Sequence, residues 1–158
     1  MAPKPTPAEV VTWSVAALTV LEKAATLIAQ KYARKDMFTN PQATKDFLTY
    51  KMNQHDREVF AVMLLDNQHR LIEFRELFYG TIDAAPVYPR EVVKLVLEKN
   101  AAAVIFAHNH PSGVAEPSAA DRRITERLKE ALSMIDVKVL DHIIVGETPV
   151  SFAERGLI

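Results

Sequence analysis

The chain has 158 residues, of which 49% are hydrophobic, 19 are lysine or arginine and 20 are aspartate or glutamate. This length suits one domain with its own core, and the net charge of −1 argues against a protein that holds nucleic acid over a broadly basic face. Cysteine is absent, which excludes disulfides and thiolate metal sites. Any transition metal must therefore be bound by imidazole and carboxylate groups, and we expect a reducing, cytoplasmic location.

The N-terminal segment, residues 1–36, is predicted to be a tail followed by one long helix. Three prolines fall in the first seven residues, and over residues 8–35 apolar side chains recur at every third and fourth position. The uncharged stretch Val10–Leu21 is shorter than the roughly 20 residues that span a bilayer, and no clean signal-peptide cleavage site follows it. We therefore expect no membrane association. The helix is expected to pack on the rest of the chain, or otherwise to join two copies as a homodimer.

Residues 37–158 are predicted to form one α/β domain, with a mixed β-sheet flanked by helices. Asn40 before Pro41 is typical of an N-cap followed by a proline in the first helical turn, which predicts a short helix to about Met52. The apolar run over 58–65 predicts a buried strand, and the alternating segment 70–79 predicts an antiparallel neighbour. Further helices are expected over 90–99 and 118–134, a central strand over 101–107, a loop over 108–117, and strands over 137–145 and 149–152.

A candidate metal site lies in the segment that follows the predicted central strand. His108 and His110 are two residues apart, so an extended chain projects both imidazoles to the same side. Asp121 lies in the first turn of the next predicted helix, which opens with the capping-box-like pattern Ser118-x-x-Asp121. Each feature alone has a simpler explanation, since Ser118 is a good N-cap and the helix dipole favours Asp121. Together they predict a catalytic zinc site with two imidazoles, one carboxylate and a fourth position left to water.

The same residues resemble a known motif. His108-x-His110-Pro111 followed by Ser118-x-x-Asp121 is similar to the JAMM signature of the JAB/MPN metallopeptidase-like superfamily. Over roughly residues 37 to 158 the sequence is most similar to the RadC-like branch, which implies a JAB/MPN, cytidine-deaminase-like zinc domain. The matching segments are Arg57-Glu58-Val-Phe, Leu64-Leu65-Asp66, Gly80-Thr81, Pro89-Arg90-Glu91-Val92, Asn100-Ala-Ala-Ala, His108-Asn-His-Pro-Ser-Gly113, Leu140-Asp-His-Ile-Ile-Val-Gly146 and Ser151-Phe152.

The resemblance implies a role for each site residue. His108, His110 and Asp121 would bind Zn²⁺, and Glu58 would act as the general base on the zinc-bound water. Ser118 would donate to the developing oxyanion or to the water, in competition with its role as a helix cap. Other carboxylates are weaker candidates for the base because they suit solvated strand positions or a helix N-terminus (Glu73, Glu76 and Glu91). His142 is expected to be structural or to contact a ligand rather than to bind the metal.

Two departures from the relatives bear on function. RadC-like proteins carry an N-terminal element that looks like a helix-hairpin-helix DNA-binding module, whereas this chain has the single predicted helix over 8–35. Asn109 stands where peptidase members carry Ser or Thr between the two histidines, which is expected to change how the loop is tied. The first hypothesis is a zinc metallopeptidase or isopeptidase acting on a protein or peptide. A zinc phosphodiesterase is a weaker one.

The alternative hypothesis is a non-enzymatic DNA-repair or mobile-element accessory of the RadC type. Its support is a group of basic residues beside the site (Arg122, Arg123, Arg127 and Lys129). Glu126 and Glu130 alternate with these residues, which is more typical of a solvated helix face than of a DNA-binding surface. The balanced net charge also argues against DNA as a partner.

Overall fold

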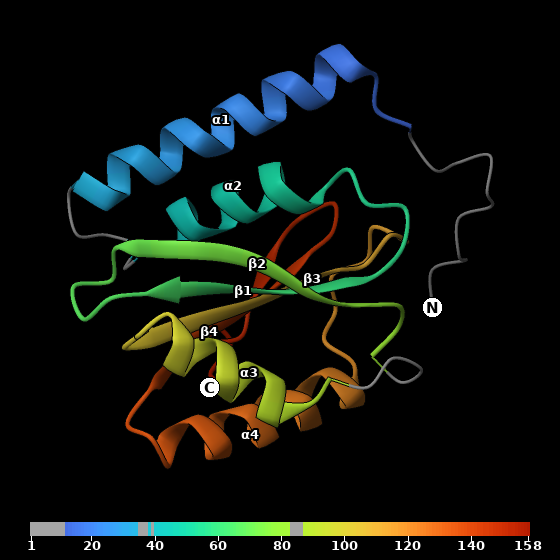
Figure 1. The fold of residues 1–158 in the computed structure, drawn as a ribbon. Coiled ribbons are helices and arrows are strands. Elements are labelled where there is room, and N and C mark those ends of the chain that lie inside the picture. The colour runs from blue at the N-terminus through green and yellow to red at the C-terminus, as the bar shows by residue number, and fades with distance from the viewer. Residues whose placement is uncertain (1–11, 35–37, 39, 83–86) are drawn as a thin grey trace.

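A computed structural model describes residues 12–34, 38, 40–82 and 87–158. It has a five-stranded mixed sheet between two layers of helices, with an additional helix at the N-terminal side, which confirms the predicted fold class (Figure 1). The elements in chain order are α1 (Val15–Arg34), α2 (Pro41–Met52), β1 (Val59–Leu65), β2 (Leu71–Tyr79), α3 (Pro89–Glu98), β3 (Ala103–Asn109), α4 (Ala119–Ser133), β4 (Lys138–Val145) and β5 (Val150–Ser151).

The sheet has the strand order β2-β1-β3-β4-β5, so β3 is its central strand, as predicted. β1 runs antiparallel to both β2 and β3, whereas β3 and β4 are parallel. The parallel pairing requires a crossover, and α4 supplies it. The C-terminal ends of β3 and β4 therefore lie at the same edge of the sheet.

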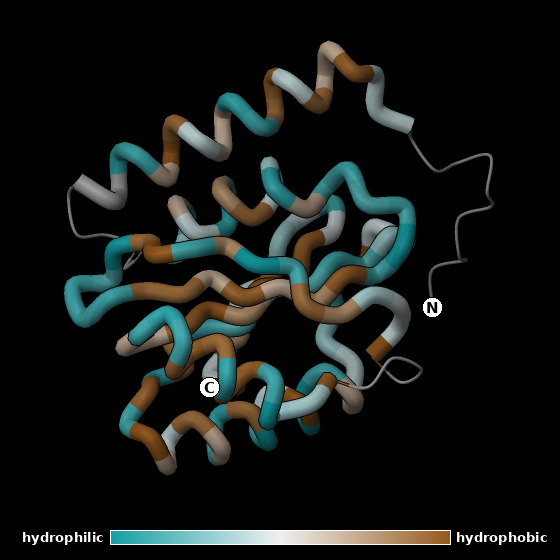
Figure 2. Tube along the Cα trace, viewed as in Figure 1, coloured by the Kyte–Doolittle hydropathy of each residue, from teal (hydrophilic) through white to brown (hydrophobic). Residues whose placement is uncertain are grey.

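Residue parity along the central strands divides the core into two layers. Odd-numbered residues of β1 and β3 pack with α2 and with the inward side of α1, in the cluster that contains Phe47, Leu48 and Met63. Even-numbered residues of the same strands pack with α3 and α4, in the cluster that contains Phe106 and Leu128. Every residue of β1 and β3 is buried, and the tube along β1 in Figure 2 is mostly hydrophobic. An even-numbered polar residue of β3 must therefore face the α4 layer.

The helix α2 begins and ends where the sequence predicts. The Asn40 side chain accepts a hydrogen bond from the Gln42 N–H at 2.9 Å, and Pro41 occupies the first turn, where its missing N–H does no harm. The helix ends at Met52, which is completely buried.

The predicted helix over 8–35 begins later, at Val15, and residues 12–14 are not helical. Ser14 acts as an N-cap, since its Oγ accepts a hydrogen bond from the Ala17 N–H at 3.1 Å. Residues 8–11 and 35, which the predicted helix also includes, lie outside the described residues. One face of α1 packs within the chain, because Ala25 is fully buried and Glu22 pairs with Lys51 at 2.6 Å. No helix in the described part of the chain is both long enough and apolar enough to cross a membrane.

A buried carboxylate fastens the C-terminal segment to the sheet. Asp141 on β4 accepts hydrogen bonds from its neighbour's N–H (His142, 2.7 Å), from the Ala153 N–H at 2.9 Å and from the Ser151 hydroxyl at 2.5 Å. These bonds hold β5 and the following turn against β4, where Phe152 is completely buried.

We expect Asp141→Ala to lower the free energy of unfolding by about 1–3 kcal/mol, because it leaves two backbone N–H groups and a hydroxyl without their acceptor. Ser151→Ala removes one of the three bonds and should cost less. Urea denaturation of the metal-free protein measures both values. A stability of Asp141→Ala equal to that of the wild type would contradict this account of the C-terminal segment.

Candidate metal centre

The central strand β3 extends two residues beyond its predicted end and carries the first histidine. His108 and Asn109 were predicted to lie in a loop, but they are part of the strand. The reason is that both neighbours continue to pair, with Phe60 opposite His108 on β1 and Val145 opposite Asn109 on β4. The His110 N–H then donates to the Val145 carbonyl at 2.8 Å, which keeps the chain extended through the second histidine.

The carboxylate comes from the first turn of α4. Ser118 is the N-cap of this helix, and its Oγ accepts a hydrogen bond from the Asp121 N–H at 3.0 Å. The Asp121 carboxylate returns to accept the Ser118 N–H at 2.8 Å, which completes the capping box that the sequence predicts. This cap fixes the carboxylate at the helix start, where it faces the even-numbered side of β3.

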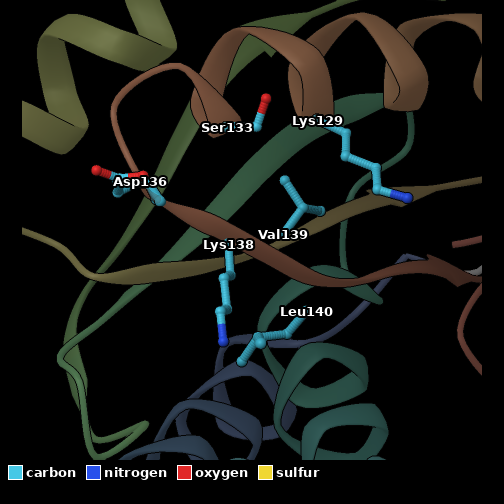
Figure 3. A pocket seen from close by; sticks show the side chains of 7 residues that line it. Lys129, Ser133, Asp136, Lys138, Val139 and Leu140 are labelled. Carbon is cyan, nitrogen blue, oxygen red and sulfur yellow. The ribbon is translucent and has the colours of Figure 1, made fainter.

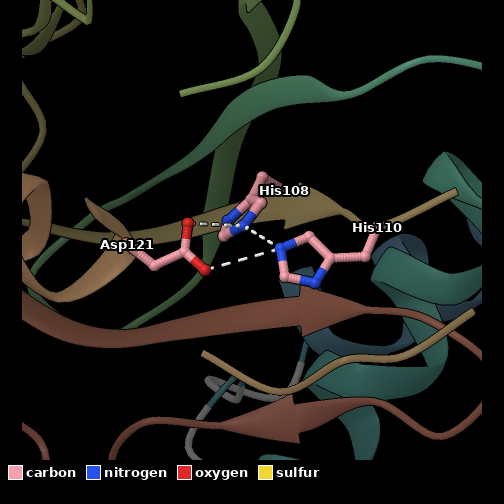
Figure 4. A group of neighbouring side chains, drawn as sticks. All are labelled: His108, His110 and Asp121. Carbon is pink, nitrogen blue, oxygen red and sulfur yellow. Dashed lines mark hydrogen bonds and ion pairs between the residues drawn. The ribbon is translucent and has the colours of Figure 1, made fainter. Parts of the chain in front are cut away.

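The structure brings His108, His110 and Asp121 together, as Figure 4 shows, and we refer to these three residues as the metal group. The two Nε2 atoms lie 2.9 Å apart. Asp121 places one oxygen 3.1 Å from the His108 Nε2 and the other 3.4 Å from the His110 Nε2. One ligand atom from each residue lies within 4.8 Å of the others, which is the arrangement of a group that can hold a metal ion. The side chains of His108 and Asp121 are 1% and 3% exposed, and that of His110 is 14% exposed.

The loop after β3 determines which nitrogen of His110 carries its hydrogen. The Nδ1 atom lies 2.8 Å from the Val114 carbonyl, which can only accept, so Nδ1 is the protonated nitrogen. This loop is held against the end of β4, because the Glu147 N–H donates to the Gly113 carbonyl at 2.8 Å. A Cβ on Gly146 would lie 2.6 Å from the same carbonyl, so only glycine permits this approach. The Nε2 of a neutral His110 therefore presents its lone pair to Asp121.

Two acceptor groups that face each other require a cation between them. The Nε2 lone pair of His110 points at an ionised carboxylate, and a metal ion or a proton can relieve the repulsion. Burial alone would raise the pKa of Asp121, but its interactions with the imidazoles of His108 and His110 hold it well below its usual range. Burial alone would lower the pKa of His110, yet the Asp121 carboxylate raises it above its ordinary value. Two imidazoles and a carboxylate without any thiol fit a divalent transition metal ion.

Glu58, the predicted base, lies at the same edge of the sheet. It directly precedes β1 and is partly buried. Phe60 pairs with His108, so continuing this antiparallel register by two residues would set Glu58 opposite His110. The negative charge of Glu58 also contributes to the raised pKa of His110. The other carboxylates considered for the base lie in ion pairs elsewhere, such as Glu76 with His55 at 2.9 Å.

Asn109 holds the backbone on both sides of Glu58. Its Oδ1 accepts a hydrogen bond from the Val59 N–H at 2.7 Å, and its Nδ2 donates to the Arg57 carbonyl at 2.8 Å. Asn109 was expected to change how its own loop is tied. Its side chain instead continues the pairing between β3 and β1 beyond the last backbone pair.

The remaining predicted residues take different positions. Ser118 is exposed, and its cap uses one oxygen lone pair, so the hydroxyl hydrogen remains available to donate. The two roles expected for Ser118 therefore use different parts of one hydroxyl. His142 is completely buried behind His108, with its Nε2 2.8 Å from the His108 Nδ1. It contacts one member of the group and does not belong to it.

The sheet also carries an apolar hollow at its other end, with a volume of about 500 Å³ (Figure 3). It lies between the end of α4 and the beginning of β4, and its lining includes Lys129, Lys138 and Val139. Neither histidine nor a pair of carboxylates is among its lining residues, and none of the metal group takes part. The chemistry-bearing side chains therefore lie away from this hollow.

Comparison with known proteins agrees with the geometry. Residues 38–157 match the model of the RadC-like JAB domain. Two proteins of Vibrio cholerae serotype O1, each named UPF0758 protein, are 66% and 62% identical over 137 residues, which cover 87% of this chain and 87% of each relative. A UPF0758 protein of Idiomarina loihiensis is 61% identical over 140 residues, which cover 88% of this chain but only 62% of that longer relative. The chain belongs to the RadC-like JAB domain family.

Proposed function

We propose that this protein is a zinc-dependent hydrolase that cleaves an amide or isopeptide bond in a protein or peptide. The observation that carries the proposal is the meeting of His108, His110 and Asp121 at one sheet edge, with Glu58 beside them. The exposure of His110 gives the group an open side, whereas His108 and Asp121 are buried. A site with three protein ligands and one open position is typical of catalytic rather than structural zinc.

The chemistry of hydrolysis gives each group of the site a proposed role. Zinc, when bound, lowers the pKa of a water molecule to about 7 and polarises a carbonyl. Glu58 accepts a proton from the attacking water as its oxygen bonds to the carbonyl carbon. Glu58 then returns this proton to the leaving nitrogen as the C–N bond breaks, which yields a carboxylic acid and an amine. Ser118 donates its hydroxyl hydrogen to the oxygen that gains negative charge.

The family assignment supports the proposal in a limited way. The JAB superfamily includes hydrolases, whereas the name UPF0758 specifies no reaction. The reaction, the substrate class and the identity of the metal therefore rest on the site itself. Since the chain covers only 62% of the longer relative from Idiomarina loihiensis, the activities of that whole protein do not transfer with the domain.

One observation favours the alternative of a DNA-binding accessory. Arg122, Arg123 and Arg127 are exposed on α4, and no carboxylate pairs with them in the part of the chain that the structure describes. Exposed Glu126 and Glu130 lie on the same helix and dilute this charge. Salt-dependent DNA binding that is lost on charge reversal at Arg122 and Arg123 would support the alternative. The absence of binding at low salt would end it.

We expect the protein, purified without a polyhistidine tag, to bind about one zinc ion per chain. Zinc should raise the melting temperature of the metal-free protein, since a ligand at 100 times its Kd stabilises the fold by about 2.7 kcal/mol. Both effects should be lost in His108→Ala. The control is His69→Asn, which changes a histidine in a turn at φ 62°, where Asn is well tolerated. Metal analysis and thermal melting measure the result, and equal zinc content in both variants would contradict the site.

Glu58→Gln should retain zinc and lose turnover by about 10²–10⁴-fold, because the amide cannot accept the proton from water. The assay compares wild type and variant on a panel of peptide and isopeptide substrates. Glu91→Gln is the matched control, because Glu91 lies at the start of α3 and its ion pairs with Arg90 and Lys94 are long, at 3.8 and 3.9 Å. A zinc-loaded wild type that cleaves no member of the panel, or a fully active Glu58→Gln, would count against the proposed reaction.

Asn109→Ala should lower the free energy of unfolding by about 1–3 kcal/mol, because a buried N–H of Val59 and the carbonyl of Arg57 lose their partner. Chemical denaturation of the metal-free protein separates this effect from zinc binding. Asn67→Ala, in the exposed turn between β1 and β2, is the control and should change stability little. Equal stability of the two variants would show that Asn109 does not hold the Glu58 segment.

A further inference from the structure

A buried chain of hydrogen bonds runs behind the metal group and returns to it. The His108 Nδ1 lies 2.8 Å from the His142 Nε2, and the His142 Nδ1 lies 2.6 Å from the Thr125 Oγ1. The Thr125 Oγ1 lies 2.6 Å from the backbone carbonyl of Asp121. His108, His142 and Thr125 are each at most 1% exposed, so water does not compete for these contacts. The chain therefore links one candidate ligand on β3 to another on α4.

The carbonyl at the end of this chain determines the direction of every bond in it. A carbonyl only accepts, so the Thr125 hydroxyl donates to Asp121 and its oxygen accepts from His142. His142 then carries its hydrogen on Nδ1 and has a lone pair on Nε2. The His108 Nδ1 must donate to this lone pair. The other nitrogen of His108, Nε2, is left with its lone pair facing the Asp121 carboxylate and His110.

The packing around His142 holds its ring in the orientation that this chain needs. The ring stacks on Phe152 with centroids 4.7 Å apart, and it meets Phe60 and Phe106 edge-on at 5.7 and 6.3 Å. Its backbone N–H is bound by Asp141.

We propose that His142 and Thr125 are positioning residues for the metal site, and that they fix His108 in the tautomer with a free Nε2 lone pair. This inference rests on the proposed function in one respect, namely that the group of three binds zinc. Hydrogen bonds to the second nitrogen of a histidine ligand commonly contribute 10- to 100-fold to metal affinity. The chain of hydrogen bonds from His108 ends at the backbone carbonyl of Asp121. It therefore orients His108 on β3 and Asp121 on α4 together.

The test compares zinc affinity in Thr125→Val and Thr125→Ser by competition with a chromophoric chelator, using the full chain. Thr125→Val keeps the shape but removes the hydroxyl, and we expect it to bind zinc about 10- to 100-fold more weakly. Thr125→Ser keeps the hydroxyl and should bind within about threefold of the wild type. Thr44→Val is the matched control, because Thr44 is also buried and donates to a backbone carbonyl, that of Asn40 on the other face of the sheet.

A second measurement reads the tautomers directly and remains decisive if a variant is unstable. Nitrogen-15 NMR of the zinc-loaded wild type should show the hydrogen of His142 on Nδ1 and that of His108 on Nδ1. A hydrogen on the His142 Nε2, or wild-type affinity in Thr125→Val, would overturn the inference while the zinc site stands. A wild type that binds no zinc at all would overturn the proposed function, and the inference with it.

Discussion

At the C-terminal end of β3, the Nε2 atoms of His108 and His110 meet the carboxylate of Asp121 within 3.4 Å. Two backbone carbonyls determine which ring nitrogen of each histidine carries its hydrogen. The Val114 carbonyl takes the hydrogen of His110, and the Asp121 carbonyl, through Thr125 and His142, takes that of His108. Both lone pairs are thereby directed at a carboxylate, and a metal ion or a proton between them makes the arrangement favourable. The rest of the domain holds the two imidazoles and the carboxylate in this arrangement.

Two strand pairings and one buried carboxylate hold these acceptor groups in place. Pairing of β3 with β4 keeps the chain extended as far as His110, and the parallel direction of this pair places the start of α4 above it. Pairing of β3 with β1 brings Glu58 to the same edge, where Asn109 replaces the backbone as the partner of Val59. Asp141 secures the strand that carries His142. Each of these contacts joins segments that are distant in sequence, so the site exists only in the folded domain.

The family assignment and the proposed hydrolase activity rest on different observations. The match to the RadC-like JAB domain covers residues 38–157 and identifies the fold and the motif. The reaction is inferred from the acceptor geometry and from Glu58. Helix α1 lies entirely outside the matched segment and packs on α2, on the opposite side of the sheet from α4 (Figure 1). Its exposed apolar residues, among them Val15, Val20 and Leu27, belong to a part of the molecule that the proposed chemistry does not use.

The sequence alone determined the features whose signals are local. The N-cap Asn40 and Pro41 set the start of α2, the apolar run identified β1, and the His-x-His and Ser-x-x-Asp patterns identified the metal group and its capping box. Only the tertiary structure decided that β3 continues through Asn109, because His108 pairs with Phe60 on β1 and Asn109 pairs with Val145 on β4. It also decided that Asn109 binds a segment 50 residues away and that His142 lies behind His108, 34 residues away. Periodicity reports which face of an element is apolar, whereas hydrogen-bond partners at such separations are set by strand register.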